Sequence, residues 1–226
     1  MKHHHIVSIG LCAPMLLVLL GSATHVRAAQ IVPLSASASS ENVGGTRLAA
    51  NAVDGSGLTG NQHTNVPDLN KMWLNLATEI PSDAYFKIDL GGTFSVDSLQ
   101  VWNYNESAGL DRGFQTADLW TSLTGTGTPT TNPASWTKLT DDQGFTKATG
   151  ASTYTGEPIA LGGVATKFIL FDDITNYGPA FGANQVGLSE VQAFGNIIPE
   201  PSTFALAALS LLGLGCPVRR LVSTSS

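Results

Sequence analysis

Hydrophobic and polar residues alternate with a period of two through the middle of the chain. Residues 85–90 place apolar side chains at every second position, and the glycines at 91–92 follow as a turn signal. Alternation resumes over residues 96–104, where Leu99 and Trp102 fall on opposite faces. Because side chains of a strand point alternately to its two faces, the pattern predicts two half-buried β-strands joined by a tight turn.

The rest of this region continues the β pattern. Gly, Ser, Thr and Asn dominate the connections, and no long window carries an apolar stripe at helical spacing. Residues 164–171 are apolar on both faces, which is typical of a central strand. Further strands are predicted over residues 117–122, 136–139 and 187–194. Several short strands separated by turn signals indicate an all-β sandwich or barrel.

The last predicted strand departs from strict alternation. Leu188 and Val191 are three residues apart, so a period of two buries both only if the chain bulges near Ser189 and Glu190. Such a bulge turns Glu190 toward the interior. A buried carboxylate needs a cation or several hydrogen-bond donors to offset its desolvation.

The two ends of the chain carry apolar runs of a different kind. Lys2 precedes the apolar stretch Ile6–Leu20, and residues 26–28 offer small or aliphatic residues at the positions that a signal peptidase reads. Residues 1–28 are therefore expected to be a signal peptide that directs export. The predicted β domain then spans residues 30–196.

The C-terminal segment, residues 197–226, has three parts. Pro199, Glu200 and Pro201 precede an apolar run, and the basic pair 219–220 follows it. Counted generously, the run covers residues 203–218, which is shorter than the roughly 20 residues of a stable membrane span. This length fits a transient membrane anchor better than a permanent one. The alternative is an ordinary C-terminal membrane anchor.

This tail resembles the PEP-CTERM sorting signal of Gram-negative bacteria. The resemblance implies a hydrophobic sorting helix, a transient membrane anchor and processing by an exosortase-like envelope enzyme that acts on the Pro-Glu-Pro motif. It also implies that the chain is exported through the inner membrane to the cell surface or the extracellular matrix.

Composition narrows the function of the domain. Both cysteines, Cys12 and Cys216, fall in the terminal segments, so the domain has no disulfide. Seven basic residues face sixteen acidic ones between residues 30 and 196, a formal net charge of −9. Nucleic-acid binding depends on neutralising phosphates, so this charge argues against a nucleic-acid partner.

Four stretches of the domain resemble, in family order, the discoidin family, also called the coagulation-factor type C or galactose-binding-like domain. These stretches are residues 51–59, residues 85–102, residues 112–122 and residues 187–195. The resemblance implies a jelly-roll β-sandwich, here flanked by the signal peptide and the sorting helix.

The family binds one calcium ion where its Ala-x-Asp-Gly turn meets its final strand. Carried to this chain, the resemblance implies Asp54 and Glu190 as carboxylate ligands, with Thr59 and carbonyl groups near Ala52 and Gly57 completing an oxygen cage. Ca²⁺ accepts about six to eight oxygen ligands in irregular geometry. The alternative is that Asp54 only closes a turn and that Glu190 is solvated.

The domain offers little for catalysis. Its one histidine, His63, lies in a polar segment and is expected to be solvated, and there is no thiol nucleophile. The acidic pairs at 141–142 and 172–173 are sequence neighbours, so members of a pair point to opposite faces of a strand. We therefore expect a domain without enzymatic activity.

Discoidin domains bind glycans, lipids or proteins through loops at one end of the sandwich. The corresponding loops here are residues 103–112 and 176–182. They offer an aromatic platform and polar groups for sugar hydroxyls, namely Tyr177, Phe181, Asn105, Glu106 and Arg112. The simpler interpretation is that Arg112 only pairs with Glu106 or Asp111 and that the aromatic residues only pack the loops.

Carbohydrate binding, most simply of an exopolysaccharide at the bacterial surface, is therefore the expected function. The alternative is a structural envelope or biofilm-matrix protein that has no dedicated ligand site. An acidic, threonine-rich surface without disulfides suits either role.

Overall fold

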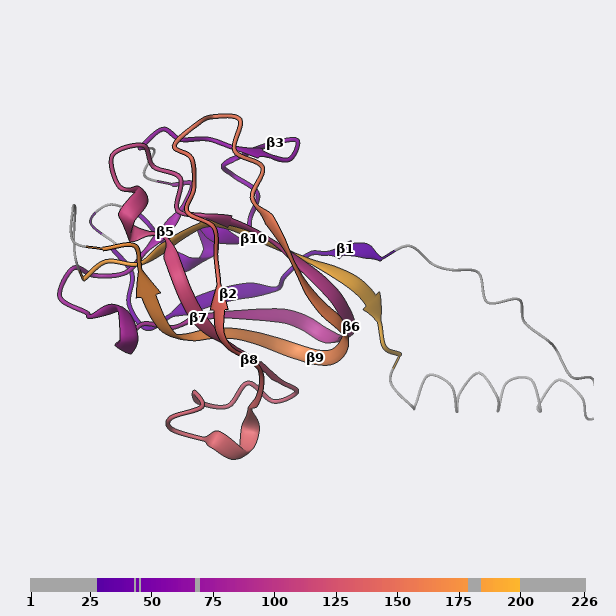
Figure 1. Cartoon of the computed structure of the whole chain (residues 1–226). Coiled ribbons are helices and arrows are strands. Elements are labelled where there is room, and N and C mark those ends of the chain that lie inside the picture. The colour runs from indigo at the N-terminus through magenta and orange to yellow at the C-terminus, as the bar shows by residue number, and fades with distance from the viewer. Residues whose placement is uncertain (1–27, 43, 45, 68–69, 179–183, 200–226) are drawn as a thin grey trace, which may run out of the picture.

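The computed structural model describes residues 28–42, 44, 46–67, 70–178 and 184–199 (Figure 1). Its strands are β1 (Ala29–Ile31), β2 (Ser35–Ala38), β3 (Leu58–Thr59), β4 (Gln62–His63), β5 (Trp73–Leu74), β6 (Phe86–Asn103), β7 (Phe114–Ser122), β8 (Thr137–Gly144), β9 (Glu157–Asn176) and β10 (Gly187–Ile197). The helical elements of the described part are short 3-10 turns: η2 (Ala49–Ala52), η3 (Pro81–Asp83), η4 (Leu110–Arg112) and η5 (Pro133–Ser135). The prediction of an all-β fold is confirmed.

Strand β6 passes through two parts of the sheet and changes partners on the way. Residues 86–89 at its start pair with β2, and its second half pairs with β10. The sequence predicted a turn at Gly91 and Gly92, but the strand continues through them with a register shift against β9. Gly91 has a φ of +79°, which glycine adopts without steric cost, so the pair bends one long strand instead of ending it.

Strand β9 is the second long element and the centre of the structure. It pairs antiparallel with β6 along most of its length and with β7 along its C-terminal half. Hydrogen-bonded neighbours therefore follow the order β1, β10, β6, β9, β7, β8. The bent strands fold this sheet into two layers that face each other, which confirms that residues 164–171 form a central strand (Figure 1).

Aromatic rings fill the space between the layers. Phe114 packs edge-on against Trp73, Phe145 and Phe171, with ring centroids 6.2, 5.6 and 5.9 Å apart. Phe86 lies 5.0 Å from Trp73. Edge-to-face contacts at such distances are favourable beyond the apolar area that they bury. These rings come from strands far apart in sequence, and they hold the layers together without a disulfide.

The predicted faces of residues 96–104 are also confirmed. Leu99 and Val101 belong to the main core. Trp102 is buried in a satellite cluster with Tyr154, and Tyr104 is buried in another. The alternation therefore separates two apolar environments, because the outer face of this strand is covered by loops.

The buried apolar clusters lie between Ile31 and Ala193, so the described part of the chain contains its own core. Strands β1 and β10, which contain these ends, pair with each other. The described residues include no helix able to cross a membrane. The predicted signal peptide, residues 1–28, and the sorting segment, residues 197–226, lie almost entirely outside the described residues.

Phe171→Ala should lower the free energy of unfolding by about 3 to 5 kcal/mol, because the ring is fully buried among other rings. Leu123→Ala should change it by less than about 0.5 kcal/mol, since that side chain is exposed. Urea unfolding of residues 28–199 measures both values. Equal losses in the two variants would contradict the assigned core.

Candidate functional site

The bulge predicted in the last strand is present in β10. The register against β6 shifts between Leu188 and Glu190, which pair with Asn103 and Trp102. Leu188 and Val191 are both in the main core, and Glu190 is only 1% exposed. The extra residue lets the strand bury apolar side chains on both sides of the bulge while it turns a carboxylate inward.

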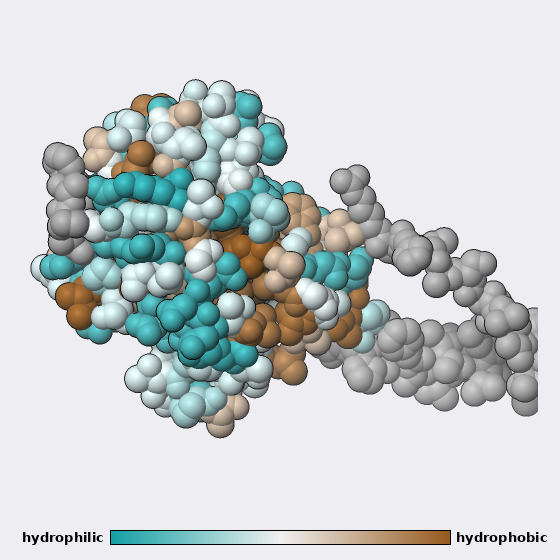
Figure 2. Space-filling model, in the orientation of Figure 1, coloured by the Kyte–Doolittle hydropathy of each residue, from teal (hydrophilic) through white to brown (hydrophobic). Residues whose placement is uncertain are grey.

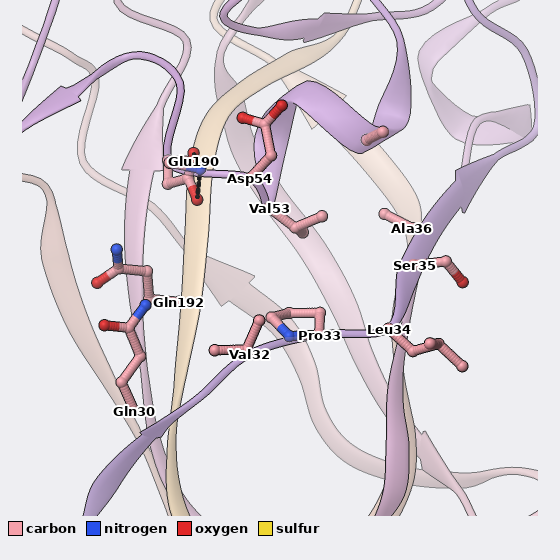
Figure 3. A pocket seen from close by; sticks show the side chains of 12 residues that line it. Gln30, Val32, Pro33, Leu34, Ser35, Ala36, Val53, Asp54, Glu190 and Gln192 are labelled. Atoms are coloured by element: carbon pink, nitrogen blue, oxygen red, sulfur yellow. Dashed lines mark hydrogen bonds between the residues drawn. The ribbon is translucent and has the colours of Figure 1, made fainter.

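Glu190 meets the turn that follows η2. Both of its carboxylate oxygens accept a hydrogen bond from the Gly55 N–H at 3.2 Å (Figure 3). No ion pair joins Glu190 to a basic side chain within the described residues. Burial raises the pKa of Glu190 to about 8; the Gly55 N–H opposes this rise and the nearby Asp54 carboxylate adds to it. The buried Glu190 carboxyl is therefore mostly protonated near neutral pH, because its ionised form has no compensating positive charge among the described residues.

The structure brings Asp54 and Glu190 to one pocket of about 530 Å³. Val32, Pro33 and Leu34 form one wall of this pocket, and the turn and β10 contribute the two carboxylates (Figure 3). Asp54 Oδ1 also accepts a hydrogen bond from the Ser56 N–H at 2.8 Å, so it closes the turn as the alternative reading expected. The other alternative, a solvated Glu190, is wrong, because the β10 bulge buries it.

The other predicted calcium ligands lie along the same turn. Ala52 is buried at the end of η2, and Thr59 is exposed in β3, where it pairs with Gln62. Among the described residues, no group of three or more acidic, histidine or cysteine side chains is arranged to hold a metal ion. Of the predicted ligands, the structure brings the two carboxylates to one pocket; two carboxylates with hydroxyl and carbonyl oxygens would be a donor set of the kind that Ca²⁺ accepts. An uncompensated buried carboxylate also fits a cation.

The predicted solvation of His63 is wrong. Its side chain is fully buried, and Nδ1 donates to the Thr64 carbonyl at 2.9 Å. A Cβ at Gly57 would lie 2.0 Å from Nε2, so Gly57 packs directly on the ring. Burial lowers the pKa of His63, and the neutral imidazole is therefore the favoured form. His63 therefore supports the predicted calcium turn by packing against Gly57.

A second group of polar side chains lies where the 103–112 loop leaves β6. Glu106 Oε2 accepts a hydrogen bond from the Tyr104 hydroxyl at 2.6 Å and pairs with Arg47 Nη2 at 2.8 Å. Arg112 Nη1 is 3.7 Å from the same oxygen, beyond hydrogen-bond distance. Burial raises the pKa of Tyr104 far above its ordinary value, so the hydroxyl stays protonated and donates. We call Arg47, Tyr104, Glu106 and Arg112 the arginine cluster.

Arg47 was not anticipated from the sequence. It is 5% exposed, and its guanidinium carbon lies 5.6 Å from the centre of the Tyr104 ring. It reaches the cluster from a segment more than fifty residues away in sequence. No spacing pattern links it to Glu106, so only the tertiary fold reveals the pair.

Asn105, predicted to contact sugar, is fully buried. Its Nδ2 group donates to the carbonyls of His63, Thr64 and Ala151 at 2.9–3.1 Å, and Oδ1 accepts from the Gly150 N–H. These bonds tie three loops together. The side chain therefore positions the loop end from beneath, with its polar atoms already occupied by backbone groups.

Tyr177 lies beside the same loop. Its backbone N–H donates to the Asp111 carbonyl at 3.1 Å, and its hydroxyl donates to the Phe145 carbonyl. Lys147 pairs with the Asp111 carboxylate and lies 5.5 Å from the centre of the Tyr177 ring. The structure thus brings Tyr177 next to the residue that precedes Arg112. Phe181, the second predicted aromatic contact, lies outside the described residues.

The sandwich is similar to solved lectin and CBM32 structures. It matches CBM32-3 from a family 31 glycoside hydrolase of Clostridium perfringens with a TM-score of 0.52 and 16% identity, covering 75% of this chain and 95% of that chain. It matches a fucolectin from striped bass, Morone saxatilis, with a TM-score of 0.51 and 16% identity, covering 73% and 46%.

The fold is that of the CBM32 and F-lectin sandwiches. This confirms the predicted jelly-roll, galactose-binding-like architecture. A truncated AlyQ with CBM32 and alginate lyase domains has a TM-score of 0.45 and 18% identity; the match covers 77% of this chain and 35% of that longer chain. No family model matches the chain, and no curated protein matches it in sequence.

The buried Glu190 predicts how stability depends on pH in the presence of a chelator. An exposed glutamate titrates near 4.5, whereas Glu190 in the folded state titrates near 8. Between these values the native state holds more protons than the unfolded state, so the free energy of unfolding falls as pH rises, by a few kcal/mol at most. Urea unfolding between about pH 5 and 8 should show this slope, and Glu190→Gln should remove it. Parallel curves for the two proteins would contradict the assigned burial.

Proposed function

We propose that this protein is an exported, non-catalytic carbohydrate-binding module that holds a glycan at the loop end of its sandwich. The observation that carries the proposal is the arginine cluster beside Tyr177. The Arg112 side chain is 20% exposed, and its buried Nε–H has no acceptor in the described structure. A sugar oxygen would accept a hydrogen bond from the exposed part of the Arg112 guanidinium, and the Tyr177 ring would supply an apolar contact for the sugar face.

Known structures of the same fold support this assignment. The CBM32 domain and the fucolectin named above bear carbohydrate-binding names, and the first of them is matched over nearly its whole length. At 16% identity the likeness concerns the backbone, so the ligand of this chain must be argued from its own residues. A neutral or acidic exopolysaccharide is the proposed partner, and nucleic acid is disfavoured by the charge of the domain.

A binding role also agrees with the environment of the groups that catalysis would use. His63 is fully buried behind the turn at Gly57. The Asp141 carboxylate is held by Lys138 at 2.6 Å. Neither group is arranged to exchange protons with a substrate in a cleft.

We also propose that calcium stabilises the domain. Asp54 and Glu190 would hold the ion with side-chain oxygens, and Thr59 with the carbonyls of Ala52 and Gly57 are the predicted remaining ligands. A bound divalent cation supplies the positive charge that the buried Glu190 carboxylate lacks. The ion would fasten the η2 turn to β10, which are otherwise joined at this point by the Gly55–Glu190 hydrogen bonds.

Calcium at about 100 times its Kd should raise the free energy of unfolding of the wild type by about 2.7 kcal/mol. Asp54→Asn and Glu190→Gln should each abolish this increment, because each removes a carboxylate ligand. Asp141→Asn is the matched control, since the Asp141 carboxylate is exposed, pairs with Lys138 and does not line this pocket. Chemical unfolding with calcium and with EDTA gives the values. Equal stability changes in both media would exclude calcium at this turn.

The proposed place of the protein is the surface or matrix of a Gram-negative bacterium. Residues 1–28 would direct export, and residues 197–226 would act as the PEP-CTERM signal for an exosortase-like enzyme. Pro199 is the last described residue, and Glu200 and Pro201 lie outside the described part. The proposal rests on the order of the Pro-Glu-Pro motif, the short apolar run and the arginine pair in the sequence.

Arrayed bacterial exopolysaccharides, probed with residues 28–199 in calcium, test the binding function. Arg112→Ala and Tyr177→Ala should each weaken selective binding by about 10-fold or more, because each removes a directed polar or stacking contact. Lys167→Ala, which removes a positive charge elsewhere on β9, should leave binding unchanged. A folded wild type that binds no glycan would favour the structural envelope role instead.

A further inference from the structure

The arginine cluster contains more positive than negative charge. Glu106 is the carboxylate that both arginines approach, and one of its oxygens already receives the Tyr104 hydroxyl and Arg47 Nη2. That leaves Arg112 at 3.7 Å, where it gains electrostatic attraction but no hydrogen bond. Two guanidinium groups thus share one carboxylate in a largely buried setting.

The arginine cluster also contains hydrogen-bond donors that have no acceptor. Arg47 Nη1 and Arg112 Nε are buried and have no acceptor among the described residues. Arg47 as a whole is 5% exposed, so water outside the domain scarcely solvates it. Buried donors without partners are rare in native proteins, and a buried charge normally has a counter-charge.

Among the described residues, other acidic side chains do not supply that counter-charge. The Asp111 carboxylate is paired with Lys147, and Glu157 accepts hydrogen bonds from the N–H and hydroxyl of Thr146. Asp111 directly precedes Arg112 in η4, but no ion pair joins these two side chains in the described structure. The local excess of positive charge is notable because residues 30–196 have a formal net charge of −9.

An anionic ligand group beside the exposed part of Arg112 would supply the counter-charge that the two guanidinium groups lack. A carboxylate or sulfate accepts several N–H bonds at once, and the planar guanidinium of arginine matches such groups better than an ammonium does. Arg112 is the partly exposed member of the cluster, so it is the member that an incoming anion meets first. Arg47, behind it, adds positive charge and fixes Glu106 in place.

We propose that Arg47 and Arg112 form an anion subsite, so that the glycan bound by this domain carries an acidic sugar. The inference rests on the proposed glycan function and specifies its ligand class. The acidic group is a uronate carboxylate or a sulfate ester, which share the chemistry that a guanidinium recognises. Arg112 contacts the anion, and Arg47 is a positioning residue that acts through Glu106.

The test compares matched oligosaccharides by calorimetry with residues 28–199. Oligogalacturonate and a sulfated galactan oligomer are the acidic ligands, and the uncharged galactan oligomer is the reference. We expect the protein to bind at least one acidic oligomer about 10- to 100-fold more tightly than the uncharged one, and which of the two it prefers identifies the anion. Raising the salt from about 50 to about 300 mM should reduce this preference, because ions screen the attraction.

Variants assign the preference to the cluster. Arg112→Gln should bring the acidic and uncharged ligands to within about threefold of each other, whereas Arg112→Lys should retain part of the preference because the charge remains. Lys167→Gln removes one positive charge elsewhere and should keep the full preference. Arg47→Lys keeps a positive charge next to Glu106, so the variant is expected to fold. Its thermal unfolding transition reports whether it does.

The possible results separate the two levels of the proposal. Equal binding of acidic and uncharged oligomers would overturn the anion subsite and leave the glycan function standing. Acidic preference that survives Arg112→Gln would overturn the assignment to this cluster. Absence of binding to every oligomer by folded protein would overturn the subsite together with the proposed function.

Discussion

The bending of two long strands is the constraint on which the rest of this structure depends. Strands β6 and β9 each cross from one layer of the sandwich to the other, and they pair with each other along the way. Because both strands contribute to both layers, their pairing joins the layers around the aromatic core, and the domain needs no disulfide. Gly91 permits the bend in β6, since its positive φ is accessible to glycine at no steric cost. The arginine cluster lies where the 103–112 loop leaves β6, and Glu190 on β10 pairs with Trp102 near the same end of β6.

The sandwich buries charge at two places, and the two places differ in sign. At the β10 bulge, Glu190 is a carboxylate without a cationic partner. At the arginine cluster, two guanidinium groups share Glu106 and leave buried donors unused. Each arrangement is unfavourable for the protein alone, and the proposed calcium ion and acidic sugar would each supply the opposite charge. Most of the visible surface is polar, and apolar residues gather toward the side of the molecule where β1 lies (Figure 1 and Figure 2).

Local pattern was sufficient for the central strands and insufficient for the edges. The period of two predicted the strands that contain Leu99 and Ile169, and broken alternation predicted the bulge at Glu190, because each depends on neighbours within a few residues. The short strands β1, β2 and β5 escaped prediction. Their two to four residues carry too little periodicity, and pairing with β10 and β6 defines them.

The all-β class, the lack of a disulfide in the domain, the strand faces and the inward turn of Glu190 could be predicted from the amino-acid sequence. Each follows from composition or from periodicity that is complete within one segment. The folded structure was needed to show that His63 and Asn105 are buried supports and that Arg47 joins Glu106. Those facts depend on which loops cover a residue and on contacts between segments far apart in the chain. No local pattern encodes such contacts, because the energy of a buried polar group depends on partners that the fold brings from elsewhere.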